Sequence, residues 1–135
     1  MMFDLLIHLT NFGLVILIWM VQLIIYPGFE YYNHQSLFKW HKKYTARITV
    51  IVLPLMVSQL GLHLFILRGI NINYPLMSLS LVLATWVVTF IWAVPLHGNI
   101  GKNIRIDHST GSLIRINWSR TALWSIIFVL DLLFL

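Results

Sequence analysis

The sequence contains no cysteine, which excludes disulfides, cysteine-ligated iron–sulfur clusters and thiolate metal sites. Charge is also scarce, because Asp, Glu, Lys and Arg make up only 10% of the 135 residues, against about 25% in an average soluble domain. Hydrophobic residues make up 59%. A chain with this balance cannot cover itself with polar side chains. It predicts an integral membrane protein in contact with a lipid bilayer, and its length allows one domain.

Acidic residues are particularly few, and none falls in the middle of a hydrophobic run. The four are Asp4, Glu30, Asp107 and Asp131. Their expected place near the membrane boundaries argues against a di-iron carboxylate site, which needs several inward-facing glutamates. It also argues against a proton-coupled multidrug carrier, which needs an ionisable acidic residue within a membrane span. Nucleophile elbows, P-loops and dinucleotide-binding fingerprints are missing as well.

Four hydrophobic runs are long enough to cross a bilayer, which takes about 20 residues per helix. They cover approximately residues 5–29, 45–67, 74–96 and 118–135. Backbone groups in lipid must be satisfied within the segment, so runs of this length predict helices. We expect an all-α fold, a single four-span transmembrane domain arranged as an up-down four-helix bundle. The first run follows no basic segment, and we expect a retained helix rather than a signal peptide.

Basic residues are distributed unevenly around these runs. All of the nine Lys and Arg residues except Arg68 flank the first and third loops. The positive-inside rule therefore predicts that both loops face the cytoplasm and that both termini lie outside it, in a bacterial inner membrane. Because the charges are placed for topology, we expect no nucleic-acid partner. The first loop should end in a helical turn that runs into the second span, whereas residues 98–116 should form a polar loop.

The fourth run begins with polar residues on one helical face. Asn117, Arg120, Thr121 and Trp124 follow one another at intervals of three and four residues. An arginine within a span costs roughly 2.5–3.5 kcal/mol on insertion scales, so it either faces the bundle interior or extends its head group to the interface. The spacing alone leaves both readings open.

The other three runs bring polar and aromatic groups to the same half of the membrane. These are Gln22 and Tyr26 from the first run, His41 and Arg47 around the start of the second, and His97 from the third. Trp19 shares the helical face of Gln22 and Tyr26, and Trp86 shares that of His97. This convergence predicts either a ligand or reaction site, or a structural cluster of interhelical hydrogen bonds. In a reaction site His41 or His97 is the expected general base, because imidazole titrates near neutral pH.

The remaining cluster residues have expected roles in the same site. Arg47 and Arg120 are candidates for stabilising an anionic phenolate or enolate. The expected ligand-binding residues are Gln22, Tyr26, Trp19, Trp86, Asn117, Thr121 and Trp124. The hypothesis makes a geometric demand, which is that His41 and His97 both point inward and border one cavity.

Four segments of the chain resemble a family of small bacterial four-span membrane proteins without a settled activity, which is distantly similar to the anthrone-oxygenase-like domain group. The segments are "VQLIIYPGF", "FKWHKKYTARI" with "LPLM", "VPLHGNI" and "NWSRTALWS". The matching positions are Gln22, Tyr26, Pro27, Phe38, His41, Arg47, Pro54, Met56, Pro95, His97, Asn117, Trp118, Arg120, Thr121 and Trp124. The family pattern has histidine where this chain has Tyr44 and glutamate where it has Gln59.

Three functions remain open at this point. The first is an oxygenase or oxidoreductase that acts on a lipophilic, aromatic or quinone-like molecule. The second is a b-type haem protein, in which His41 with His97, or His8 with His63, would ligate the iron from both sides. The third is a non-catalytic subunit of a homo-oligomer or a larger membrane complex. The residues do not decide whether the protein is an enzyme, and they predict no metal site of another kind.

Overall fold

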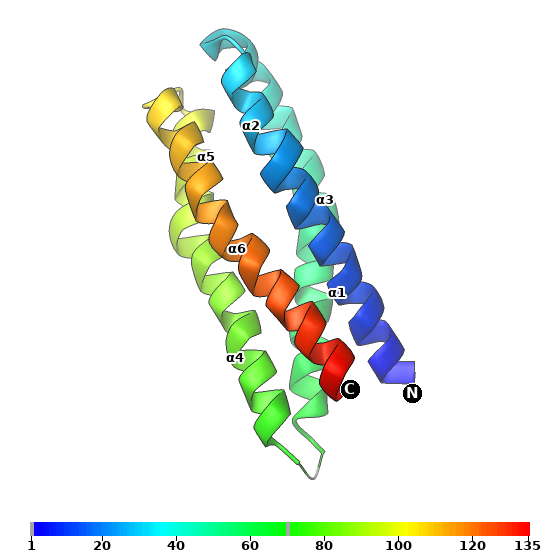
Figure 1. The fold of residues 1–135 in the computed structure, drawn as a ribbon. Helices are drawn as coiled ribbons and strands as arrows, with labels where there is room; N and C mark the ends of the chain where they lie inside the picture. Colours follow the sequence, from blue (N-terminus) through cyan, green and yellow to red (C-terminus); the bar gives the residue numbers. More distant parts are fainter. Residues whose placement is uncertain (1, 70) are drawn as a thin grey trace.

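The computed structural model describes residues 2–69 and 71–135, and this part of the chain is helical without any strand. Four long helical rods lie side by side, and each runs antiparallel to the one before it (Figure 1). The predicted all-α, up-down four-helix bundle is therefore confirmed. The rods are Met2–Tyr31, His34–Ile66, Asn73–Gly101 and Ile106–Phe134.

The first and third rods are interrupted helices, whereas the second and fourth are continuous. The first consists of α1 (Met2–Met20), the π-helix η1 (Val21–Ile25), α2 (Tyr26–Gly28) and the 3₁₀-helix η2 (Phe29–Tyr31). The second is α3 (His34–Ile66). The third consists of α4 (Asn73–Val88), the π-helix η3 (Thr89–Ala93) and α5 (Val94–Gly101). The fourth is α6 (Ile106–Phe134).

Both chain termini lie at one end of the bundle, beside the α3–α4 connection (Figure 1). We call this the terminal end. The opposite end carries the connections before α3 and before α6, and we call it the basic end because most Lys and Arg residues lie near it.

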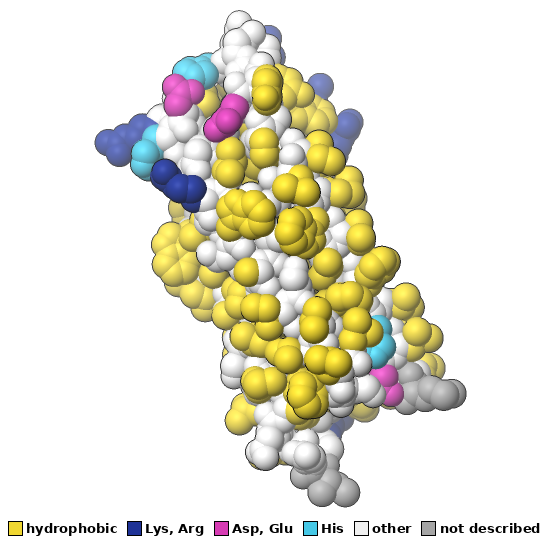
Figure 2. Space-filling model, viewed as in Figure 1, with side chains coloured by type: hydrophobic (Ala, Val, Ile, Leu, Met, Phe, Trp, Pro, Cys, Tyr) yellow, Lys and Arg dark blue, Asp and Glu magenta, His cyan; other side chains and the backbone are white. Residues whose placement is uncertain are grey.

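All four rods are long and apolar enough to cross a membrane. Hydrophobic side chains cover the middle of the molecule, while most of the charged side chains and histidines in view lie toward its ends (Figure 2). The interior is unusually polar by comparison, since Asn, Gln, His, Arg and Asp side chains are buried in it. An apolar exterior around interhelical hydrogen bonds is the arrangement that a lipid environment favours. The structure therefore supports a multi-pass membrane protein.

The helices extend beyond the hydrophobic runs at the basic end. α3 begins at His34, where the Asn33 side chain caps it by accepting a hydrogen bond from Ser36 N at 2.8 Å. This confirms the expected helical approach to the second hydrophobic run.

The polar loop expected over residues 98–116 is not a loop, and that prediction is wrong. α5 continues to Gly101, and α6 begins at Ile106. The short turn between them is formed by Asn103 and Arg105 with positive φ values of 57° and 45°. Polar residues can continue a helix when its other face is covered, and Ser109 and Leu113 are fully buried against the bundle.

Two prolines explain the interruptions in the first and third rods. Pro27 and Pro95 each come two residues after a π-helix. Proline has no N–H and its ring clashes with the carbonyl four residues earlier. The chain accommodates each ring with one wide turn, in which the backbone N–H of Tyr26 bonds to Val21 O and that of Val94 bonds to Thr89 O. Such turns often lie at functional sites.

Candidate functional site

Three side chains from three segments form a hydrogen-bonded chain in the basic half of the bundle. His41 Nε2 of α3 lies 2.8 Å from His97 Nδ1 of α5, and His97 Nε2 lies 2.8 Å from the Tyr26 hydroxyl of α2. The two imidazole rings are 5.0 Å apart, and His41 and Tyr26 are each only 2% exposed. Both rings therefore point inward and meet, as predicted, but only His97 lines the cavity described below, so the prediction that both border it is wrong for His41. The chain can pass a proton between the hydroxyl and the far imidazole.

A second chain of hydrogen bonds begins at Arg120 and has only one orientation. A guanidinium can only donate, so the contact of Arg120 Nη1 at 3.2 Å must be with the Asn117 carbonyl oxygen. The Asn117 amide nitrogen then donates to Gln22 Oε1 at 2.9 Å, and Gln22 Nε2 donates to the Ile114 backbone carbonyl at 3.3 Å. These bonds join the first and fourth rods and fix the position of Arg120.

The Arg120 side chain is buried without a countercharge. It is 6% exposed, and its Nε has no hydrogen-bond partner. In the described part of the chain no carboxylate lies within ion-pair distance of it. Its other contact is with the face of the Trp124 ring, 5.1 Å from the guanidinium carbon. Arg120 also lies close enough to Tyr26 and His97 for its charge to act on both.

A cavity of about 330 Å³ lies beside these groups. Polar groups from Tyr26, Tyr44, His97 and Arg120 contribute to its wall, while most of the remaining lining is apolar. The rim is formed by exposed side chains of the second and third rods. These are Thr49 and Leu53 of α3, Phe90 of η3 and Val94 of α5. The cavity therefore opens sideways between two rods, onto the surface that faces lipid in a membrane.

Three residues predicted for this site lie elsewhere, and their predicted placement is corrected here. Arg47 is exposed on α3, because six residues after His41 it lies about 240° further around the helix. Trp19 is 38% exposed and donates to Ser125 Oγ at 3.1 Å. Trp86 is half-buried and stacks on Phe90 at 5.4 Å.

The π-helices account for the two misplaced tryptophans. Regular helical spacing put Trp19 on the face of Tyr26, and Trp86 on the face of His97. A π-helix inserts one extra residue in a turn and so rotates everything after it. η1 separates the first pair and η3 the second, so neither tryptophan lines the cavity.

The other predicted residues surround the cavity wall without all lining it. His41, Gln22 and Asn117 are bonded to residues of the wall or to Arg120. Thr121 is buried, but its hydroxyl donates to the Asn117 backbone carbonyl at 2.9 Å. Tyr44, where the resembled family has histidine, lines the cavity although we did not predict it as a site residue.

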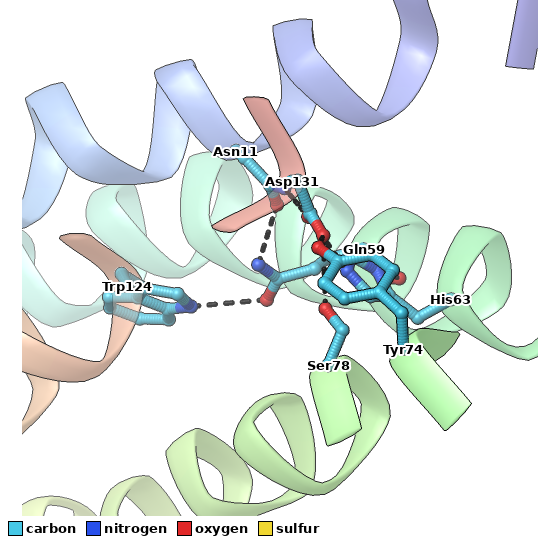
Figure 3. A network of polar contacts seen from close by, with 7 residues as sticks. All are labelled: Asn11, Gln59, His63, Tyr74, Ser78, Trp124 and Asp131. Carbon is cyan, nitrogen blue, oxygen red and sulfur yellow. Dashed lines mark hydrogen bonds and ion pairs between the residues drawn. The ribbon is translucent and has the colours of Figure 1, made fainter. Parts of the chain in front are cut away.

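A separate polar network occupies the terminal half of the bundle (Figure 3). Its centre is Asp131 of α6, which is 0% exposed and accepts hydrogen bonds from Asn11 Nδ2, the Tyr74 hydroxyl and, at 3.0 Å, Ser78 Oγ. His63 Nε2 lies 3.0 Å from the same carboxyl group. We call this the Asp131 network, and it consists of Asn11, Gln59, His63, Tyr74, Ser78, Trp124 and Asp131. Its members come from all four rods.

The amide groups of the Asp131 network also have one orientation only. Indole nitrogen can only donate, so Trp124 Nε1 faces Gln59 Oε1 at 3.1 Å. Gln59 Nε2 must then donate to Asn11 Oδ1, which is 2.7 Å away, and Asn11 Nδ2 donates to Asp131. A row of hydrogen bonds thus points toward the carboxyl group.

His63 and Asp131 together hold one shared proton. His63 Nδ1 lies 2.7 Å from the Gln59 backbone carbonyl, which only accepts, so Nδ1 carries a hydrogen. The contact between His63 Nε2 and Asp131 Oδ2 needs one further hydrogen on either atom. Whether it is an ion pair or a neutral pair, the two side chains have no net charge. This neutrality lowers the cost of placing a carboxyl group inside an apolar bundle.

Asp131 was expected near a membrane boundary because it lies close to the end of its hydrophobic run, and that position gave no sign of its burial among the other rods. The signal was present in the spacing. Gln59 and His63 lie four residues apart on α3, and Trp124 and Asp131 lie seven apart on α6, so each pair shares a helical face. Gln59, where the resembled family has glutamate, is part of this network rather than of the cavity.

Neither histidine pair considered for haem is arranged to hold an iron. His41 and His97 bond directly at 2.8 Å, whereas an ion between two imidazole nitrogens, each about 2 Å away, would require about 4 Å. His63 is bonded to Gln59 and Asp131 rather than to His8. Over residues 2–69 and 71–135 no group of three His, Asp or Glu side chains is placed to bind a metal ion.

Comparison of the chain with models of protein families, with curated proteins and with solved structures found no match. The resemblance described from the sequence therefore stays a prediction, and the site is interpreted from its own geometry.

Proposed function

We propose that this protein binds a lipophilic molecule with an aromatic or quinone-like head in the cavity beside Tyr26, His97 and Arg120. The observation that carries the proposal is a cavity of about 330 Å³ that combines a largely apolar lining with a few polar groups. This combination is typical of small-molecule sites. The lateral opening gives a membrane-dissolved molecule a route from lipid into the bundle.

The chain of Tyr26, His97 and His41 supports a chemical role for the site. A hydroxyl group of a bound molecule can give its proton to the Tyr26 oxygen, while the Tyr26 proton moves to His97 Nε2. His97 Nδ1–H can in turn donate to His41 Nε2, and the positive charge ends on His41. His41 is thus the net general base. Oxidation of the bound molecule would in addition need an electron acceptor from outside this chain.

The proposal includes an orientation in the bacterial inner membrane. The basic end would face the cytoplasm, because Lys and Arg concentrate there. The cavity would then lie in the cytoplasmic half of the membrane.

Filling the cavity tests the proposal. Ala93 is 2% exposed and lines the cavity, so Ala93→Phe should occupy the space that a ligand needs. We expect this variant in nanodiscs to lose at least about tenfold in affinity for an alkylated hydroxynaphthoquinone. Ala46→Phe, at an exposed position of α3, is the matched control and should bind normally. Equal binding by both variants would contradict the proposed site.

A second candidate, a non-catalytic subunit of a larger membrane complex, is favoured by the Asp131 network. This network ties all four rods together. On this interpretation the buried polar side chains only fix how the helices are aligned with one another. Ala93→Phe should then leave both quinone binding and co-purification of partner subunits unchanged.

A further inference from the structure

The described part of the chain holds no countercharge for the Arg120 guanidinium. This residue is buried, with only 6% of its surface exposed. It contacts the neutral Asn117 amide oxygen and the face of Trp124, and the groups closest to it besides these, Tyr26 and His97, are not acids with a negative charge at neutral pH. The four carboxyl groups of the chain are placed elsewhere, and the buried one, Asp131, is bonded within its own network. A buried charge without a partner is costly, so such charges are normally paired.

The cavity offers the place where the missing partner would lie. Arg120 is part of its wall, and Arg120 Nε has no acceptor among residues 2–69 and 71–135. The hydroxyl group of Tyr44 belongs to the same wall and can donate a hydrogen bond, whereas that of Tyr26 is already bonded to His97 Nε2. The polar part of the cavity therefore carries one fixed positive charge. It is complementary to a negatively charged acceptor.

We infer that the cavity takes its ligand as a lipophilic anion with a single negative charge, paired with Arg120. This inference rests on the proposed binding site and specifies its ligand class. A ligand that enters already ionised needs no proton transfer to His41, and one that enters neutral reaches the same anion through it. A carboxylate or the ionised hydroxyl of a hydroxyquinone fits one guanidinium. A phosphate monoester does not, because it would bring about 1.5 to 2 charges against one. The volume of about 330 Å³ is at the small end for ligand pockets and restricts the head to one or two rings.

The test compares two probes that differ only in charge. One is an alkylated hydroxynaphthoquinone, whose acidic hydroxyl is ionised at neutral pH, and the other is its uncharged methyl ether. Binding is measured to the protein in phosphatidylcholine nanodiscs, which contain no competing anionic lipid, with empty nanodiscs as the blank. We expect the anion to bind at least about tenfold more tightly than the ether.

Variants assign this preference to Arg120. Arg120→Gln should remove the preference, and Arg120→Lys should keep most of it because the charge remains. Arg115→Gln is the matched control, since it makes the same change at an exposed position of the same helix and should keep the preference. If Arg120→Gln fails to fold, the comparison of the two probes on the native protein still decides the matter.

The outcomes separate this inference from the proposed function. If both probes bind equally and Ala93→Phe weakens both, the inference that the ligand is an anion is overturned. The proposed function then stays in place. A preference for the anion that Arg120→Gln preserves would overturn the assignment to Arg120. Binding of neither probe above the blank would overturn the proposed function and the inference together.

Discussion

Trp124 is the residue at which the two polar assemblies meet. Its ring faces the Arg120 guanidinium, and its Nε1 donates to Gln59 of the Asp131 network. Asp131 itself has the larger energetic role, because it is bonded to four other side chains, and each buried donor left without its acceptor costs about 1–3 kcal/mol. We therefore expect Asp131→Asn to be strongly destabilised in thermal unfolding in detergent.

Asp107→Asn is the matched control for that change. The Asp107 side chain is 88% exposed, and its ion pair with His34 is on the surface. Surface pairs contribute about 0–1 kcal/mol, so this variant should unfold close to the native protein. If Asp131→Asn unfolds at the same temperature as Asp107→Asn, the Asp131 network is not what holds the rods together.

Arg120 should behave differently from Asp131. Insertion of an arginine within a span costs roughly 2.5–3.5 kcal/mol, which offsets the loss of its hydrogen bond to Asn117, worth about 1–3 kcal/mol. We expect Arg120→Met to be at least as stable as the native protein without ligand. Hydroxynaphthoquinone at about 100 times its Kd should stabilise the native protein by about 2.7 kcal/mol.

The same ligand addition should leave the unfolding temperature of Arg120→Met unchanged, which a thermal-shift series in nanodiscs measures. Arg47→Met is the control, because Arg47 is exposed and lies outside the cavity. Equal stabilisation of both variants by ligand would show that Arg120 does not bind it.

At the scale of the element, the π-helix η1 determines which way Tyr26 points. Pro27 favours the wide turn because it lacks an N–H and clashes with a continuous α-helix. Pro27→Ala removes both obstacles, so α1 can continue as a regular helix and rotate Tyr26 away from His97. We expect at least about tenfold weaker quinone binding with no loss of thermal stability.

Pro54→Ala is the matched control for the element. Pro54 lies within α3, which remains α-helical around it, and its side chain is exposed. This variant should bind the probe normally. A Pro27→Ala variant that binds as well as Pro54→Ala would mean that the π-helix does not position the site.

At the scale of the whole molecule, the asymmetry of basic residues predicts the topology. Both termini lie at the terminal end, away from most Lys and Arg residues (Figure 1). The positive-inside rule therefore predicts that a phosphatase fused after Leu135, which works only outside the cytoplasm, is active. A fluorescent protein that matures only in the cytoplasm should be dark at the same position. The reverse result would place the cavity in the outer half of the membrane.

The sequence by itself determined the helices and the convergence of three key side chains. Long apolar runs fix four helices because lipid leaves the backbone no other partner. The antiparallel order then brings the ends of neighbouring runs together, which is why His41, His97 and Arg120 could be expected in one half of the bundle.

Only the tertiary structure decided which side chains share a site. Periodicity assumes a uniform helix, so it misplaced Trp19 and Trp86, which are separated from the cavity by π-helices. Position along a hydrophobic run does not reveal burial near its end, so Asp131 was assigned to the boundary. Its burial depends on donors from the three other rods, and their approach is set by packing between helices that are distant in the sequence.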